Sequence, residues 1–460
     1  MGKSARSKVK VVEVVGDPLA PKAFSLIAIA KHGIPHVFPQ ETIAEAERAV
    51  DLPLSSEHRE DLRDVPIVAI DPADARDHDD AVWAGADDDP ANPGGHVVLV
   101  AIADVSHYVD SGGAIDVDAF DRATSVYFPR RVIPMLPEKL SNGLCSLNPG
   151  VDRLCMVCDM LIDTAGEITA YQFYPAVMHS HARFTYTEVA AILSNDRGPQ
   201  AQARAERVAD LIHLHDLYRA LLAARQRRGA MDFETTETQI ICDEQGRIEK
   251  IVPRVRNDAH RLIEEAMLAA NTCAADFIVQ SKQPALFRVH EGPTPEKKET
   301  LRNYLKATGV GMNISDDPKP AEFQAIAEAT KERPDALQIH SMLLRSMQQA
   351  IYTPINSGHF GLAFEAYAHF TSPIRRYPDL LVHRVIKAIL EKRRYQLPVL
   401  PTPGEAHAKL ARRLASKVRL PATASVAKAK NTADQLAWEA AGLHCSANER
   451  RADEASRDVE

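Results

Sequence analysis

The stretch that decides the fold is Ile70-Asp71-Pro72-Ala73-Asp74-Ala75-Arg76-Asp77-His78-Asp79-Asp80-Ala81-Val82-Trp83. Apolar residues on both sides of this acidic segment have strand character, from Val65 to Ile70 before it and again from Ala81. The pattern predicts a loop that is presented from a hydrophobic core by two strands. A solvated acidic turn is the alternative that composition alone leaves open.

Four carboxylates of this loop are the candidate metal ligands, namely Asp71, Asp77, Asp79 and Asp80. Several carboxylates held together repel one another and need either protons or a cation. Oxygen ligands select hard divalent ions, Mg²⁺ first and Mn²⁺ second. Mg²⁺ usually shares its coordination with a substrate phosphate, so such a loop indicates phosphodiester cleavage. In an extended chain Asp80 would point away from Asp77 and Asp79, so convergence requires a looped segment, which Pro72 favours.

A second cluster of polar residues is Tyr367-Ala-His-Phe-Thr-Ser-Pro-Ile-Arg375-Arg376-Tyr377-Pro378-Asp379. Two adjacent arginines just before a predicted helix start suit a phosphate clamp, because bidentate guanidinium groups and free helix N–H groups both favour anions. A structural pair of arginine with Asp379 is the open alternative.

Two weaker features complete the candidate site. Tyr127 lies beside Arg130 and Arg131, where its ring could stack on a base, although most such aromatics belong to a core. Glu264 and Glu265 lie in a long helix whose apolar face includes Ala266, so one of them is expected to reach a site at the rim of that face.

Periodicity predicts the remaining elements. A strand is expected at 96–105, after an acidic hairpin tip at 85–95. Residues 187–230 read as helix, and strands are expected near 232–252. A long helix is expected from 260, with Asn257 and Asp258 as N-cap candidates, and another helix after Pro378. Residues 396–404 read as a linker, followed by helices that stop at residue 460 without a helix-ending signal, as if cut in mid-element.

Composition excludes several classes of protein. With 460 residues, 45% of them hydrophobic, the chain can form a sizeable core, which excludes wholesale disorder. The sequence has no apolar run of about 18 residues, so it predicts no membrane span. The basic N-terminus is not followed by the hydrophobic core of a signal peptide. The 6 cysteines are too sparse for a disulfide scaffold, which predicts a reducing, cytoplasmic location, and Cys155-x-x-Cys158 reads as buried strand rather than half a zinc site. The net charge of −8 gives no global nucleic-acid signature, so a polyanion would have to bind local basic patches.

The sequence resembles the catalytic domain of the RNase II / RNase R exoribonucleases, the RNB family, from about residue 20 onward, and the RNase R branch is the closer match. Besides the acidic loop, the resemblance rests on these stretches: Ala103–Val109, Ser125–Pro129, Ile133–Glu138, Leu140–Pro149, Arg256–Glu265 and His369–Asp379.

The resemblance implies an α+β RNB domain with a channel, and a processive 3′→5′ exoribonuclease that cuts single-stranded RNA to nucleoside 5′-monophosphates with Mg²⁺. By resemblance, Asp71, Asp77 and Asp80 hold the metals, and Asp79 also helps to position metal or attacking water. Arg375 grips the phosphate near the scissile bond, with Arg376 beside it. Tyr127 packs on the 3′-terminal nucleotide, Glu265 lies near that end of the channel with Glu264 as rival, and His78 is a spacer, not a ligand.

The chain departs from the family's full domain order. The expected division is a basic arm and partial cold-shock (OB) domain at 1–45, the RNB domain at 46–395, and a linker with C-terminal helices at 396–460 leading to an absent S1 domain. The first cold-shock domain is also expected to be missing. Since OB folds supply an electrostatic funnel for single strands, weakened RNA capture is expected beside an intact active site.

Two rival functions stay open. One is a non-catalytic protein that binds RNA without cutting it, against which the four intact aspartates argue. The other is a metal-dependent phosphohydrolase that acts on nucleotides or short oligomers, which the missing OB domains favour.

Overall fold

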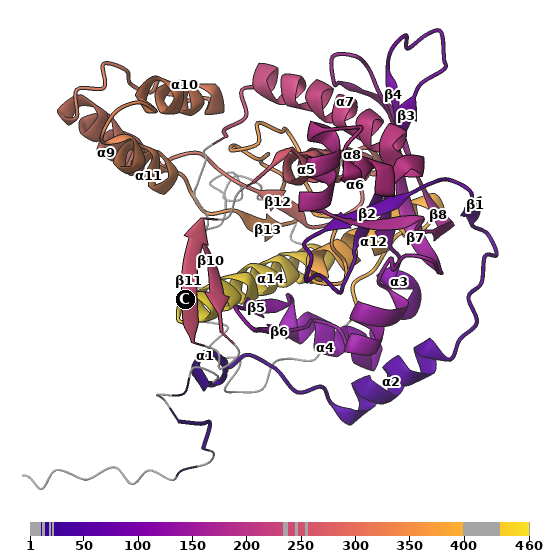
Figure 1. Ribbon diagram of the computed structural model, residues 1–460. Helices are drawn as coiled ribbons and strands as arrows, with labels where there is room; N and C mark the ends of the chain where they lie inside the picture. The colour runs from indigo at the N-terminus through magenta and orange to yellow at the C-terminus, as the bar shows by residue number, and fades with distance from the viewer. Residues whose placement is uncertain are drawn as a thin grey trace, which may run out of the picture.

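The computed structural model describes residues 11, 14–17, 20, 23–232, 238–243, 247–253, 256–398 and 433–459. Helices and strands are mixed along the chain, which confirms the α+β prediction (Figure 1). No helix in the described ranges is both long and apolar enough to cross a membrane.

One seven-stranded sheet organises the molecule, in the order β1-β8-β7-β4-β3-β2-β9. Its strands are β1 (Glu60–Leu62), β2 (Val68–Asp71), β3 (Asp80–Ala86), β4 (His96–Ala103), β7 (Asp152–Ile162), β8 (Ile168–His179) and β9 (Ala182–Thr185). The β1–β8 and β2–β9 pairs are parallel, and the other neighbours are antiparallel. Cys155 and Cys158 are buried in β7, as the strand interpretation predicted.

Three two-stranded ribbons lie outside this sheet. They pair β5 (Val126–Phe128) with β6 (Arg131–Ile133), β10 (Thr238–Cys242) with β11 (Ile248–Pro253), and β12 (Phe287–Val289) with β13 (Ile351–Thr353). The second ribbon forms where strands were expected near 232–252. Residues 87–95 join β3 to β4, so the predicted hairpin tip at 85–95 is confirmed except for its first two residues, which end β3.

The helices of the N-terminal half are α1 (Phe24–His32), α2 (Gln40–Val50), α3 (Val105–Tyr108), α4 (Ala114–Arg122), a π-helix at Lys139–Leu144, α5 (Tyr186–Ser194), α6 (Pro199–Ala203) and α7 (Ala205–Arg228). The helical prediction for 187–230 is confirmed, and the chain divides there into α5, α6 and α7. The break falls at a turn in which the Gly198 N–H donates to the Asn195 carbonyl and Pro199 begins α6.

The later helices are α8 (Asp258–Ser281), α9 (Pro295–Ala307), α10 (Pro320–Thr330), α11 (Ala336–Ser346), α12 (Tyr377–Leu390) and α14 (Ala433–Arg457). Asn257 caps α8, since its side chain accepts from the N–H groups of Ala259 and His260, and Pro378 lies in the first turn of α12. Both helix starts were predicted. Helices α7, α8 and α12 contact strands of the main sheet.

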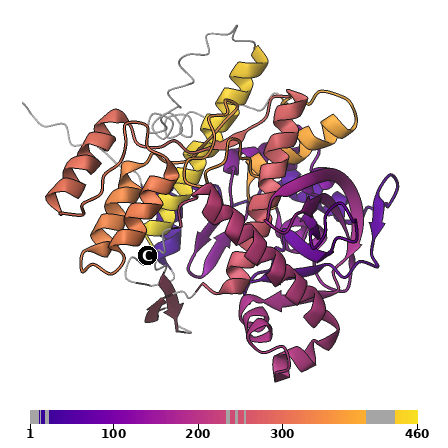
Figure 2. The same cartoon turned by 90° about the horizontal axis from the view of Figure 1, so that it is seen from above.

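The described chain has three hydrophobic cores. The largest joins the main sheet to α8 and α12. Helices α9, α10 and α11 form a second core around Leu305, Phe323 and Leu343, and both views show them set apart from the sheet (Figures 1 and 2). A third, small core joins α1, the β5–β6 ribbon and α14, whose residues lie at opposite ends of the sequence.

Two of the predicted domain limits can be compared with the helices and strands of the structure. The boundary between residues 45 and 46 falls inside α2, whose Ala46 and Ala49 belong to the largest core. The described residues between 23 and 45 hold α1 and the first part of α2 and no strand, so the OB remnant stays a prediction. Most of the predicted linker at 396–404 lies outside the described residues.

Candidate functional site

The acidic loop begins and ends on neighbouring strands of the main sheet. Asp71 is the last residue of β2 and Asp80 is the first residue of β3, and the two strands pair through Val68 and Val82. The loop is therefore anchored at both ends in the largest core, as the flanking apolar residues predicted. The solvated surface turn that was the alternative is excluded by the burial of Asp79, which is 5% exposed.

Asp79 connects the acidic loop to the arginine segment. Its Oδ1 accepts a hydrogen bond of 2.8 Å from the backbone N–H of Ile374, and its Oδ2 lies 3.9 Å from Nε of Arg375. The Asp79 carbonyl also accepts from the Ala103 N–H at 2.8 Å. The two strongest sequence motifs therefore meet at one carboxylate.

His78 has a partner, which corrects its interpretation as a spacer. The side chain is 3% exposed, and Nδ1 lies 2.7 Å from Oδ2 of Asp71. The His78 backbone N–H donates to Oγ of Ser146 at 2.9 Å. This pair ties Asp71, at the start of the loop, to His78 near its end. His78 therefore orients a candidate metal ligand.

Burial and mutual repulsion disfavour charge on the aspartates. Burial raises the pKa of Asp79 well above its ordinary value, although the charge of Arg375 opposes the shift. Burial and the charge of Asp71 raise the pKa of Asp80 to about 8, and burial also raises the pKa of Asp77. These groups therefore favour either a proton or a cation as partner.

The donor chemistry fits a hard divalent ion, because every candidate ligand is a carboxylate. In the described part of the chain, however, no three His, Cys, Asp or Glu side chains converge closely enough to surround one ion. Asp71 is turned toward His78 instead. The four aspartates are gathered on one loop, and their closed arrangement around a metal is not formed.

Tyr127 lies at the edge of the same site. Its hydroxyl is 3.5 Å from Oδ2 of Asp77, and the residue is 45% exposed on β5. Two residues earlier, the Ser125 N–H donates to the Arg375 carbonyl at 2.9 Å. The aromatic ring is thus positioned beside both the aspartates and Arg375 and has a free surface.

The two adjacent arginines have different surroundings. Arg376 binds Asp379 in a bidentate pair, Nε to Oδ2 at 2.9 Å and Nη2 to Oδ1 at 2.8 Å, with the Asp379 side chain fully buried. The alternative left open in the sequence is therefore correct for Arg376, and its assignment to RNA binding is corrected. The Arg376 guanidinium binds the first turn of α12 through Asp379 and so stabilises the start of this helix. The Arg375 side chain is 42% exposed and remains open to a ligand.

The two glutamates of α8 also differ. Glu265 is buried and pairs with Nη1 of Arg225 at 2.8 Å, whereas Glu264 is exposed and pairs with Arg256. Burial raises the pKa of Glu265, and Arg225 opposes that shift. Among the described residues, no hydrogen bond or ion pair joins either glutamate to the four aspartates.

Ser146 is a site residue that sequence reasoning missed. Its fully buried hydroxyl accepts from the His78 N–H and lies 3.1 Å from the Arg76 carbonyl, to which it can donate. A serine in a loop carries no periodic signal, so only its position in the stretch Leu140–Pro149 could have drawn attention to it.

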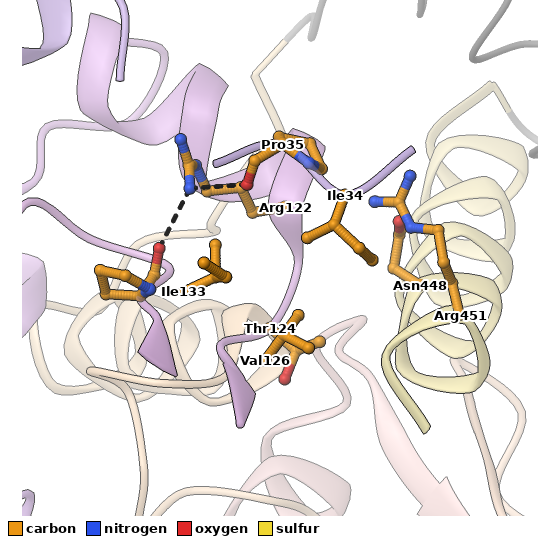
Figure 3. Close-up of a pocket in the computed structure, with 9 residues that line it drawn as sticks. Ile34, Pro35, Arg122, Thr124, Val126, Ile133, Asn448 and Arg451 are labelled. Carbon is orange, nitrogen blue, oxygen red and sulfur yellow. Dashed lines mark hydrogen bonds between the residues drawn. The ribbon is translucent and has the colours of Figure 1, made fainter. Parts of the chain in front are cut away.

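The ribbon that carries Tyr127 is supported by both ends of the chain. Oγ of Ser456, in α14, donates to the Tyr127 carbonyl at 2.8 Å. A small cavity beside the ribbon is lined by residues that include Ile34, Arg122 and Arg451, and Arg122 Nη1 donates there to the carbonyls of Pro35 and Pro134 (Figure 3). None of the four aspartates lines this cavity, so it is separate from the acidic site.

Comparison with known proteins places this geometry in a family. Residues 59–392 match the RNB domain family. The chain is 46% identical over 452 residues to ribonuclease R of Escherichia coli K12. The alignment covers 98% of this chain and 52% of that protein. The chain therefore spans about half the length of the curated relatives it matches.

Solved structures share the fold. The structure of Mycoplasma genitalium RNase R in complex with ribose methylated single-stranded RNA matches with a TM-score of 0.79 and 27% identity, covering 97% of this chain and 64% of that chain. Yeast Ssd1, described as a pseudonuclease, matches with a TM-score of 0.71 and 18% identity, covering 97% of this chain and 50% of that one, and this likeness shows the fold alone. The match over residues 59–392 and the identity to ribonuclease R show that the chain belongs to the RNB family.

Proposed function

We propose that this chain carries the catalytic domain of a processive 3′→5′ exoribonuclease, which hydrolyses single-stranded RNA to nucleoside 5′-monophosphates. The observation that carries the proposal is the meeting of Asp79 with Ile374 and Arg375. It brings the acidic loop, an exposed guanidinium and the half-exposed ring of Tyr127 to one site. Carboxylates, a partly exposed guanidinium and an aromatic surface are the parts that cleavage at a strand end requires.

Asp71, Asp77, Asp79 and Asp80 would hold Mg²⁺, with Mn²⁺ as a substitute. A bound ion would supply Lewis-acid activation of water and neutralise charge on the phosphate. The raised pKa values of Asp77, Asp79 and Asp80 support this assignment, because a partly buried cluster of acids is stabilised by a cation.

The protein groups have separable tasks in this proposal. The Ile374 N–H fixes one oxygen of Asp79 and leaves the other facing Arg375. Arg375 binds the phosphate and stabilises the charge that develops on it. Tyr127 packs against the 3′-terminal nucleotide beside Asp77, and Glu265 supports the wall near that end of the channel through Arg225.

The choice of RNA as substrate draws on the relatives. Mycoplasma genitalium RNase R has been solved with ribose methylated single-stranded RNA and with double-stranded RNA. Preference for RNA over DNA would rest on contacts to the 2′-hydroxyl.

The test is a gel time course of single-stranded RNA labelled at its 5′ end, beside DNA of the same sequence, with Mg²⁺ or with EDTA. We expect RNA alone to be degraded, only with Mg²⁺, with accumulation of a very short product that retains the label. A shift of RNA on a native gel without cleavage would instead support a protein that binds RNA and does not cut it.

A second comparison separates exonuclease from small-substrate hydrolase. Turnover of a dinucleotide is measured beside turnover of a long RNA of matched composition. The processive function predicts a clear advantage for the long RNA. Equal turnover would contradict it and favour a phosphohydrolase acting on short oligomers.

A further inference from the structure

Arg183, on β9, binds the backbone of the acidic loop at three points. Its Nη2 donates to the carbonyls of Pro72 at 3.2 Å, Ala73 at 2.9 Å and Ala75 at 3.0 Å. These carbonyls belong to the part of the loop that follows Asp71. One guanidinium nitrogen therefore fixes the direction in which the chain turns immediately after the first candidate metal ligand.

The sheet places Arg183 where this contact is possible. Strand β9 runs parallel to β2, with Arg183 paired to Ala69 and Thr185 paired to Asp71. Arg183 therefore lies level with Ala69, two residues before the end of β2. From there its side chain extends along the strand direction to the loop. The Arg204 guanidinium donates to the Arg183 carbonyl at 3.3 Å, which ties the backbone at the base of this side chain.

Within the part of the chain that the structure describes, the charge of Arg183 has no carboxylate partner. Among the described residues no Asp or Glu side chain forms an ion pair with it, and its buried Nε has no hydrogen-bond partner. Three carbonyl dipoles that converge on one nitrogen form an environment suited to a cation. Because Arg183 binds backbone carbonyl groups here, it stabilises one conformation of the loop and not a network of ion pairs.

The second half of the loop is held by a different residue, Ser146. Ser146 bonds the Arg76 carbonyl and the His78 N–H, so the loop is clamped before and after Arg76 by residues distant in sequence. Between these clamps, the chain must bring Asp71 and Asp77 back toward each other. Loss of either clamp would widen the turn.

We infer that Arg183 is a positioning residue for the acidic loop. It fixes the curl of residues 72–75, so that the carboxylates on either side of the curl can share a divalent cation. This inference rests on the proposed function only for the identity of the reaction, because the effect on cation binding can be measured without RNA.

The test compares the variants Arg183→Ala and Arg183→Lys with the parent chain. The control is Arg302→Ala, since Arg302 also donates to loop carbonyls, those of Ile314 and Ser315, but in the separate core of α9–α11. The measurements are Mn²⁺ binding by electron paramagnetic resonance without RNA, amide hydrogen exchange of residues 72–80, thermal unfolding, and kcat and KM for RNA cleavage.

We expect Arg183→Ala to weaken Mn²⁺ binding and to lower kcat by about tenfold or more, since a misplacement of about 1 Å in a catalytic group can cost 10²-fold. KM for RNA should change by less than about threefold, and exchange in residues 72–80 should be faster. Arg183→Lys should recover part of the Mn²⁺ affinity, because an ammonium group also donates to several carbonyls. Arg302→Ala should match the parent in Mn²⁺ binding and kcat.

Three results would overturn the inference. The first is a folded Arg183→Ala protein whose Mn²⁺ affinity and kcat match those of the parent. The second is a rise in KM alone, which would place Arg183 on the RNA. If Arg183→Ala does not fold, Arg183→Met decides, because it keeps the aliphatic stem and loses every N–H donor, and a folded Arg183→Met protein with parental Mn²⁺ affinity and loop exchange is the third. A parent that binds Mn²⁺ but cuts no RNA would contradict the proposed function and leave the Mn²⁺ comparison valid.

Discussion

The backbone N–H of Ile374 donates to Oδ1 of Asp79 at 2.8 Å, which joins residues 295 positions apart in the sequence. The bond fixes the orientation of a buried carboxylate, so that its other oxygen faces Nε of Arg375 at 3.9 Å. An acid held by a backbone group on one side and by a cation on the other is pre-oriented for its task before any ligand arrives.

Replacing Asp79 by asparagine should separate cleavage from binding. The amide oxygen can still accept from Ile374, so the loop should keep its position, while the charge is lost. We expect RNA cleavage to fall by at least about 100-fold, the size of effect for removing one pre-oriented electrostatic group, with RNA affinity nearly unchanged. Single-turnover cleavage and filter binding measure the two quantities. Asp88→Asn, at an exposed position of the β3–β4 connection, is the matched control and should behave as the parent.

The two adjacent arginines should fail in different ways. Arg376→Ala leaves the fully buried Asp379 without its partner, so we expect a loss of about 3–5 kcal/mol in the free energy of unfolding. Arg375→Ala removes a half-exposed group and should lower kcat/KM by at least about 100-fold with little change in stability. Urea unfolding and steady-state cleavage distinguish the cases. Equal stability losses for both variants would contradict this division of roles.

The sequence predicts residue types well and their partners poorly. The aspartates, Arg375 and Tyr127 were singled out by residue type and by the resemblance to the RNB family, and the structure places them near one another, while their roles stay predictions. The partners of Arg376, His78 and Glu265 depend on side-chain orientation and on distant segments. For Arg376 the sequence left a bound phosphate and Asp379, three residues away, as equal candidates, and only the fold shows that the local carboxylate is the partner.

The same limit applies to larger elements. The hydrophobic pattern of 187–230 is helical almost throughout, yet the turn at Asn195–Gly198 divides it. The role of α14 could not be predicted either, because its Ser456 contacts the Tyr127 carbonyl across 329 positions of the sequence. Local periodicity contains no information on which distant helix supports an active-site ribbon.

The glutamates of α8 provide a test of burial against exposure. Glu265→Ala leaves the partly buried guanidinium of Arg225 without its carboxylate and should cost about 3 kcal/mol of stability. Glu264→Ala breaks an exposed pair and should cost less than about 1 kcal/mol. Thermal unfolding of the two variants measures the difference. If Glu264→Ala were the more damaging change to RNA cleavage, the assignment of Glu265 to the channel wall would be wrong.

A change in α14 should act on RNA through Tyr127. Ala455 is fully buried in the small core that supports the β5–β6 ribbon, so Ala455→Asp should displace the ribbon. We expect KM for RNA to rise toward that of Tyr127→Ala, which removes stacking worth about 1–3 kcal/mol, with a smaller effect on kcat. Leu436→Ala, at an exposed position of the same helix, should leave KM unchanged.

Cation binding should depend on pH through Asp80. In the folded protein, burial and the charge of Asp71 raise the pKa of this carboxyl to about 8. Its proton therefore contributes stability that is fully present below the unfolded pKa and is lost as pH rises through about 8. A divalent cation binds the deprotonated form, so its affinity should rise with pH by roughly tenfold per unit for each proton displaced.

Mn²⁺ titrations followed by electron paramagnetic resonance at a series of pH values measure this dependence. We expect the affinity to level off above about pH 8, where Asp80 no longer carries a proton in the free protein. Asp80→Asn removes both a ligand and the raised group, so the variant should bind Mn²⁺ more weakly and with a flatter pH profile. The direction of the trend follows from burial and from the charge of Asp71, because both favour the protonated carboxyl, which must lose its proton before it binds the metal. An affinity that is constant between about pH 6 and pH 8 would show that Asp80 is already ionised there and that burial does not control the site.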